Sequence, residues 1–168
     1  MNQTQKTSPS EQLQALLQLE DELQVSSFSN EDALDLGLCA VEWIKEAGKG
    51  GVFIEIRRAG NTIFSYCMEG ANHDNRLFAE RKLKTVTMFE HCSMLAGIKY
   101  QTKGRSFEDY YAPQEYQAKG GGFPIRIPGT GMVGMIGVSG LSAEEDHEVC
   151  VMALRKFLDK IRKKKGSL

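Results

Sequence analysis

The sequence lacks any long apolar run and carries almost no net charge. No stretch of about 18 consecutive apolar residues occurs in the 168-residue chain, so we expect no membrane-spanning helix. The opening MNQTQKTSPSEQLQ has no apolar core of the kind that a secretory signal needs, which predicts a cytoplasmic protein. The formal net charge is -1, so no overall field attracts nucleic acid or an anionic membrane.

Closely spaced cysteines are also missing. The chain has Cys39, Cys67, Cys92 and Cys150, which are too far apart for a CxxC metal or redox pair. Each of the four has apolar neighbours, so we expect buried free thiols in a reducing compartment.

What is present is the composition of one globular domain, with 41% hydrophobic and 26% charged residues. A chain of this length buries roughly two thirds of its unfolded surface, so it needs neither a disulfide nor a metal to fold. We expect a disordered N-terminal tail over residues 1–10 and a single domain over residues 11–168.

Hydrophobic periodicity predicts two helices followed by a hairpin. Leucines recur at helical spacing across residues 11–25. A second helix begins near Ser29, where S-N-E-D offers a capping oxygen and acidic side chains. Alternating apolar residues predict strands over 52–58 and 62–68, which a short turn joins.

The second half of the chain continues with helix, hairpin and helix. One long helix is predicted over residues 72–97, and the polar connection over 98–119 has room for one short helix around 106–111. FPIRIPG and GMVGMIGVSG predict a second hairpin, and a capping box of Ser142 and Glu145 opens the last helix. The order ααββαββα predicts an α+β fold, in which helices cover a mostly antiparallel sheet.

Two motifs suggest activities that their context does not support. Residues 129–134 match GxGxxG, but they lead into an apolar strand rather than a helix, so a turn and close backbone packing explain the glycines better. Residues 137–141 resemble a nucleophile elbow, yet Leu141 replaces its final glycine.

Lys82 lies on the apolar seam of the predicted long helix. A lysine there either extends outward or meets a carboxylate. Asp146, Glu145 or a second subunit could supply that partner, or Lys82 could anchor an anionic ligand.

The three histidines leave several roles open. His147 falls in the first turn of the last helix, where it is a haem-iron or metal ligand, an acid–base group, or the donor of a structural hydrogen bond. His73 precedes the long helix and could face the mouth of a pocket, whereas His91 is expected at the surface.

Three stretches carry a family resemblance. They are NHDNRLFAERKLKTVTMFEHCSMLAG at 72–97, EYQAKGGGFPIRIPGTG at 115–131 and GMIGVSGLSAEEDHEVCVMAL at 134–154. Together they resemble the haem-degrading-domain-like, uncharacterised protein family 0303, and the match covers about residues 11–165 in order. The family often has tryptophan where Leu77 stands and histidine where Lys119 stands, so ligand contacts at these two positions do not carry over.

The resemblance implies a profilin-like α-β-α layered domain that assembles into a ring or another homo-oligomer. It also implies a distant relation to haem-binding proteins of the GlcG/HbpS-like type. Eukaryotic members of the family look like accessory factors in membrane-protein targeting, which favours interaction over catalysis.

Our leading hypothesis is a non-catalytic, oligomeric protein that binds a small molecule and has no nucleic-acid or membrane partner. Haem binding or breakdown, with His147 or His73 as axial ligand, is the second hypothesis, and a structural or interaction role is the third. The predicted ligand-binding residues, from the long helix, the GGGFPI strand and the start of the last helix, are Lys82, Phe89, Phe123, Arg126, Asp146 and His147.

Overall fold

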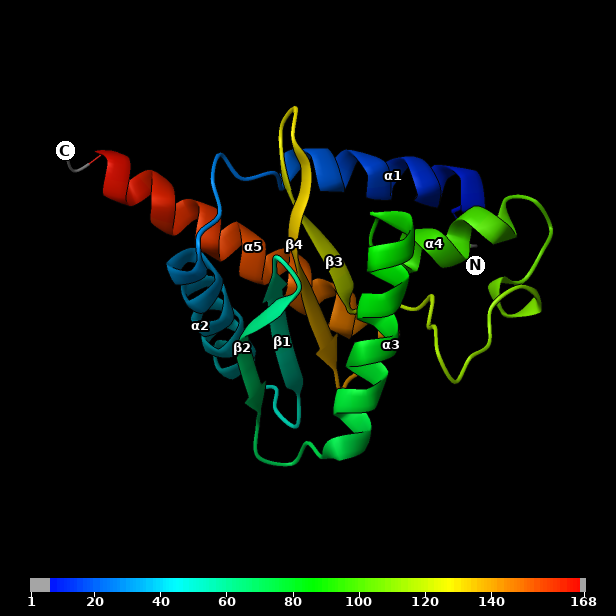
Figure 1. Ribbon diagram of the computed structural model, residues 1–168, viewed down its shortest axis with the longest axis horizontal. Helices are drawn as coiled ribbons and strands as arrows, with labels where there is room; N and C mark the ends of the chain where they lie inside the picture. The colour runs from blue at the N-terminus through cyan, green and yellow to red at the C-terminus, as the bar shows by residue number, and fades with distance from the viewer. Residues whose placement is uncertain (1–6, 167–168) are drawn as a thin grey trace, which may run out of the picture.

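The computed structural model describes residues 7–166, which form a four-stranded antiparallel sheet with helices on both faces (Figure 1). The strands lie in the order β2-β1-β4-β3. In chain order the elements are α1 (Pro9–Glu22), α2 (Asn30–Glu46), β1 (Phe53–Arg58), β2 (Asn61–Cys67), α3 (His73–Phe89), α4 (Ser93–Gln101), the 3-10 helix η1 (Phe107–Asp109), β3 (Gly122–Ile127), β4 (Gly131–Ser139) and α5 (Ala143–Gly166). The predicted α+β class and α-β-α layering are confirmed.

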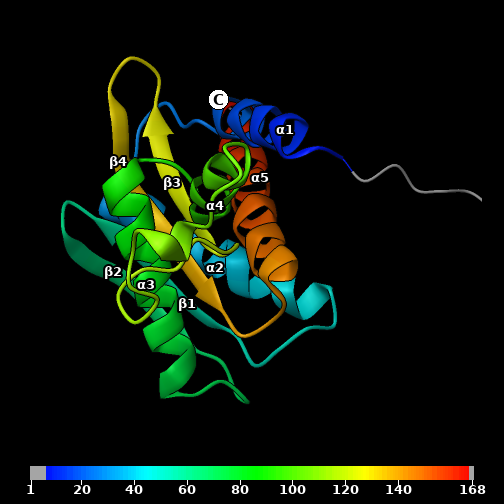
Figure 2. The ribbon, with the colours of Figure 1, turned by 90° about the vertical axis from the view of Figure 1, so that its right-hand side faces the viewer.

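The helices form separate layers on the two faces of the sheet (Figures 1 and 2). α3 packs on one face, where a Cβ added to Gly137 of β4 would lie 2.7 Å from Leu83. α2 and α5 pack on the opposite face, and Gly37 of α2 sits directly against the ring of Phe64. Glycine at these two positions therefore allows the helices to approach the strands closely.

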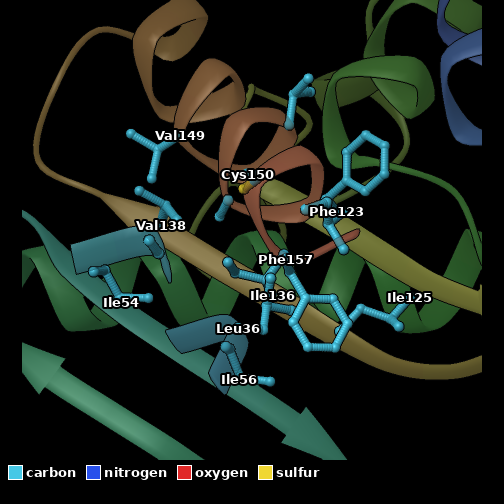
Figure 3. Packing of buried hydrophobic residues seen from close by; sticks show 14 of the residues in the cluster. Leu36, Ile54, Ile56, Phe123, Ile125, Ile136, Val138, Val149, Cys150 and Phe157 are labelled. Atoms are coloured by element: carbon cyan, nitrogen blue, oxygen red, sulfur yellow. The ribbon is translucent and has the colours of Figure 1, made fainter. Parts of the chain in front are cut away.

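The main core lies between the sheet and the layer formed by α2 and α5 (Figure 3). Ile54 and Ile56 point into it from β1, while Leu36 of α2 and Phe157 of α5 meet them from the helices. These four side chains are almost completely buried, and burying each contributes about 1.5–3 kcal/mol relative to exposure.

α1 begins earlier than predicted. Ser8 caps the helix, because its hydroxyl accepts the Glu11 N–H at 3.3 Å while the Glu11 carboxylate accepts the Ser8 N–H at 2.7 Å. Pro9 suits the first helical position, where no N–H is needed. Residues 8–10 are therefore not part of a disordered tail, and residues 1–6 of the expected tail lie outside the described part of the chain.

The prediction of a single long helix over 72–97 is wrong, because the helix is interrupted at Glu90 and forms two helices, α3 and α4. Glu90 has a φ of 55°, and its carbonyl accepts a hydrogen bond from the Arg126 guanidinium. The buried Glu20 carboxylate accepts the Cys92 N–H at 2.6 Å. These partners come from β3 and α1, so they override a helical periodicity that continues across the break.

The second hairpin is confirmed. β3 and β4 pair antiparallel from Gly122–Gly137 to Ile127–Gly131. Gly129 and Gly131, which belong to the GxGxxG match, have positive φ values in the turn and at the start of β4. The motif is thus a hairpin turn, and η1 confirms the short helix expected around 106–111.

Three of the four cysteines are buried as predicted, but Cys67 is exposed on the edge strand β2. Its position at the end of that strand explains the difference, because the last three residues of β2 are all exposed. All four thiols are free. Between residues 7 and 166, no helix is both long and apolar enough to cross a membrane.

Candidate functional site

Lys82 of α3 and Asp146 of α5 form a buried ion pair beside the C-terminal end of β4. The Lys82 ammonium lies 2.8 Å from Asp146 Oδ2, and the two residues are 4% and 2% exposed. Lys82 also donates to the carbonyl of Val138 at 2.9 Å. Of the partners that the sequence left open for Lys82, the structure shows Asp146, and the pair joins the two helix layers through the end of β4.

The start of α5 places Asp146. The Ser142 hydroxyl accepts the Glu145 N–H at 3.2 Å, and Glu145 accepts the Ser142 N–H at 3.1 Å, which confirms the predicted capping box. Asp146 Oδ1 then accepts the Leu141 N–H at 3.0 Å. The Asp146 carboxylate is held from both sides, by the loop before α5 and by Lys82.

Glycine at the start of β3 makes room for the ion pair. Gly121 has a φ of 117°, and a Cβ at this position would lie 2.7 Å from the Lys82 ammonium and 2.9 Å from Asp146 Cβ. The Gly122 N–H donates to the Ser93 hydroxyl at 2.9 Å, which ties the strand to α4. Glycine at these two positions therefore allows the backbone to pass close to α3, α4 and α5.

Burial and charge act in opposite directions on Asp146. Burial raises the pKa of its carboxyl, while the Lys82 ammonium and the hydrogen bond from Leu141 lower it. Burial has the larger effect, so the pKa lies above its ordinary value. At the surface of the same helix start, Lys49 and Ser142 lower the pKa of Glu145 to about 2.

A cavity of about 330 Å³ opens over the ion pair, and we call it the Lys82 groove. It is lined by Asp74, Asn75, Phe78, Lys82, Gln117, Lys119, Ser139, Gly140, Leu141, Ala143 and Asp146. The buried Gln117 Oε1 has no hydrogen-bond partner within the described residues. The Gln117 backbone N–H is bonded to Thr85 Oγ1 at 3.1 Å, so the residue itself is held in place.

The ring of His147 lies beside this site but does not line the groove. Its centroid is 5.8 Å from the centroid of Phe123, and the two rings are tilted by 54°. Nδ1 is buried without a hydrogen-bond partner in the part of the chain that the structure describes, so the structural hydrogen bond is absent at this atom. Burial lowers the pKa of His147.

The structure brings together four of the six predicted ligand-binding residues and separates two. Lys82 and Asp146 line the groove, with Phe123 and His147 in contact next to them. Phe89 instead packs 5.9 Å from Phe107 in an aromatic cluster beyond the far end of α3. Arg126 donates to the Glu90 carbonyl, so its guanidinium serves the break between α3 and α4.

The other two histidines differ in their surroundings. His73 is exposed at the first turn of α3, next to the Asn72 cap. His91, expected at the surface, is half-buried with Nδ1 2.6 Å from Glu20 Oε2. Within residues 7–166, no group of three or more histidine, cysteine or acidic side chains is arranged to hold a metal ion.

A larger cavity of about 680 Å³ is lined by residues of α2 and α5. Two of its lysines already have acidic partners, because Lys156 lies 2.9 Å from Glu46 and Lys160 lies 2.9 Å from Asp35. Because these ion pairs are exposed to solvent, each contributes little energy, and we regard the cavity as a solvated surface groove rather than a binding site.

Sequence similarity identifies the class of protein that this fold represents. The family described as "Haem degrading protein HbpS-like" matches residues 28–155, and the chain belongs to it. Within that class it is a member of the UPF0303 group. A UPF0303 protein of Psychromonas ingrahamii is 40% identical over 153 residues, which cover 90% of this chain and 96% of the relative. One from Streptomyces coelicolor is 38% identical over 133 residues, covering 78% and 84%.

Solved structures share the architecture. The Ybr137w protein superimposes with a TM-score of 0.80 at 29% identity, covering 88% of each chain. HbpS gives 0.62 at 24% identity, covering 77% of this chain and 89% of its own. A PduOC:heme complex gives 0.65 at 22% identity, covering 77% and 94%. The last two similarities show the fold alone.

Haem, which the family description suggests, does not fit the Lys82 groove. Haem iron takes an axial ligand from histidine, cysteine, methionine or tyrosine, and none of these lines the groove. The unpartnered His147 nitrogen is buried, and the backbone of Gly120 packs against the residue's Cβ. The described residues therefore provide no preformed haem site there.

Sequence reasoning missed Gln117 and Lys119 as lining residues. Both lie in the connection over 98–119, which carries no periodic pattern. The only available signal was their position just before the Gly120-Gly121-Gly122 run, where the backbone approaches α3 and α5 closely.

Proposed function

We propose that this protein is a non-catalytic binding protein that holds a small polar anion in the Lys82 groove. The observation that carries the proposal is that Lys82, with its buried ammonium, and Gln117, whose amide oxygen has no partner among the described residues, line the same cavity. An ammonium has three N–H donors, and Lys82 uses one on Asp146 and one on Val138. The third donor and Gln117 Oε1 are the groups that a ligand would satisfy.

The rim of the groove supports an anionic group on the ligand. Lys119 is exposed at the mouth, and Lys82 lies in the wall. A ligand carboxylate or phosphate reaching both would form charge-assisted hydrogen bonds, while a hydroxyl or amine of the ligand would donate to Gln117. Phe78 adds an apolar wall.

A binding role is favoured over catalysis because the buried carboxylate of the groove is already committed. The Asp146 carboxylate accepts from Lys82 and Leu141, so neither oxygen is free of a strong donor. Neither His147 nor His73 is among the residues that line the groove, so no histidine of its lining is available to exchange a proton with a ligand.

We further propose a cytoplasmic homo-oligomer. Four free cysteines support a reducing compartment. Large apolar side chains on the outer surface support assembly, because Leu34, Leu38 and Tyr66 are 42%, 50% and 42% exposed on α2 and β2. Light scattering after size-exclusion chromatography tests this part, and a monomer at micromolar concentration contradicts it.

Native mass spectrometry of the purified protein tests the binding role, since it reports any co-purifying small molecule. The identified molecule is then titrated by calorimetry into the wild type and into Gln117→Ala and Lys119→Ala. We expect each variant to bind about 10-fold more weakly, the effect of removing a hydrogen bond to a charged group. Lys84→Ala, an exposed lysine on α3, is the matched control and should bind normally.

Two results contradict the proposal. One is equal binding by the wild type and both groove variants. The other is haem binding at a histidine, which is tested by Soret absorbance during haem titration of the wild type, His147→Ala and His73→Ala. A Soret shift that one of these two variants abolishes would favour the haem hypothesis instead.

A further inference from the structure

A third cavity, which shares no lining residue with the Lys82 groove, combines aromatic rings with positive charge. It measures about 230 Å³ and is lined by Phe89, Lys99, Tyr100, Lys103, Arg105 and Tyr110, which we call the aromatic–basic cleft. Three of the six side chains are aromatic and three are cationic. No carboxylate is among the residues that line it.

The aromatic wall is held by ring contacts behind it. Tyr100 packs edge-on against the buried Phe107 at 5.6 Å, and Phe107 packs on Tyr111 at 4.6 Å. The Tyr100 and Tyr111 hydroxyls are hydrogen-bonded at 3.0 Å, which raises the pKa of Tyr100 to about 12. Tyr100 therefore stays a neutral, fixed ring, which adds no negative charge to the cleft.

Tyr110 leaves much of its ring uncovered. It is 52% exposed although its centroid lies only 5.2 Å from that of Tyr100. The Arg105 guanidinium lies 5.8 Å from the Tyr110 centroid, within the range of a cation–π contact. A planar ring that entered the cleft would meet the exposed part of the Tyr110 ring, beside the guanidinium that lies over it.

The backbone fixes the cations around these rings. The Arg105 N–H donates to the Tyr100 carbonyl at 3.1 Å, and the Lys103 N–H donates to the same carbonyl at 3.0 Å. Gly104 has a φ of 66°, which lets the chain reverse after α4. Lys103 and Arg105 are thereby held on the same turn as Tyr100.

The nearby acidic residues are directed to other partners. Glu108 accepts the Ser106 hydroxyl at 2.5 Å, and Asp109 accepts the Ser106 N–H at 3.3 Å. Neither carboxylate lines the cleft. The charge that an entering ligand meets is therefore positive.

From this geometry we propose that the aromatic–basic cleft binds a small molecule that joins a planar aromatic ring to a phosphate or carboxylate. The ring stacks on Tyr110, and the anionic group lies among Lys99, Lys103 and Arg105. This site is independent of the Lys82 groove, with which it shares no lining residue.

Calorimetric titration of the full-length protein tests this proposal with two probes, AMP and 2-naphthoate. Adenosine lacks the anionic group and ribose 5-phosphate lacks the ring, so they serve as matched comparisons for AMP. We expect at least one probe to bind. Tyr110→Ala should weaken that binding about 10-fold or more, as expected for the loss of a stacking ring. Arg105→Gln should weaken it about 5-fold.

Two surface substitutions provide the controls. Leu77→Ala removes an exposed apolar side chain from the start of α3, and Lys84→Gln removes an exposed lysine from the same helix. Both should leave the affinity unchanged. The proposal is overturned if neither probe binds, if adenosine or ribose 5-phosphate binds as tightly as AMP, or if Tyr110→Ala binds like the wild type. Amide chemical shifts of Tyr110→Ala, unperturbed outside the cleft, verify that the variant is folded.

Discussion

The Lys82 ammonium meets the Asp146 carboxylate at 2.8 Å, although the two residues are 64 positions apart in the chain. Both are almost fully buried, so each charge depends on the other for most of its stabilisation. Lys82→Met would leave Asp146 as an uncompensated buried charge. We expect it to lower the free energy of unfolding by about 3–5 kcal/mol, measured by urea denaturation.

Two comparisons isolate the charge effect. Lys84→Met changes an exposed lysine on the same helix and should alter stability little. The double variant Lys82→Met with Asp146→Leu removes both charges and should recover most of the lost stability. A Lys82→Met protein as stable as the wild type would show that the pair is not closed in solution.

Gly121 is a position where a single added methyl group should be harmful. Its φ of 117° is one that side chains rarely adopt, and a Cβ would lie 2.7 Å from the Lys82 ammonium. Gly121→Ala should cost about 3 kcal/mol or more, because strain and overpacking act together. Gly50→Ala is the control, since a Cβ there meets no atom within 4 Å. Equal unfolding midpoints for the two variants would contradict this interpretation.

Glu20 is expected to stabilise the break between α3 and α4. Glu20→Ala removes the acceptor of the buried Cys92 N–H, so we expect a loss of about 2–3 kcal/mol. Hydrogen exchange should speed up at the Cys92 amide, which loses its bond. Glu22→Ala, an exposed acidic residue on α1, should change neither quantity. Unchanged exchange at Cys92 in the Glu20 variant would show that another group accepts this bond.

The elements that could be predicted from the sequence are those whose signal is local. Alternating apolar residues predicted both hairpins, and the spacing of Ser142 and Glu145 predicted the cap of α5. The break at Glu90 could not be predicted, because Glu20 and Arg126 impose it from distant parts of the chain.

The residues of the candidate site also divide into those that the sequence predicts and those that it does not. Lys82 was conspicuous because a lysine on an apolar seam needs a partner, and Asp146 was among the three partners considered. No feature of the sequence distinguishes Gln117, because a glutamine in a polar connection is common. It becomes notable only because the fold buries its side-chain oxygen. Phe89 and Arg126 were predicted to line the site from their places in the expected long helix and strand. The sequence pattern did not show that the helix ends at Phe89 or that Arg126 bonds to the Glu90 carbonyl.

His147 gives the protein a pH dependence whose sign follows from its burial. Burial lowers the pKa of the folded imidazole below its ordinary value of 6.5. Below about pH 6.5 the unfolded chain therefore binds a proton that the folded chain does not, so stability falls as the pH falls through this window.

His147→Leu removes the titrating group and the unpartnered Nδ1. We expect it to be at least as stable as the wild type at pH 7 and to lose less stability between pH 7 and pH 5. Urea denaturation of both proteins across this range measures the difference. Parallel pH profiles would mean that His147 titrates normally in the folded state and that its ring is open to water.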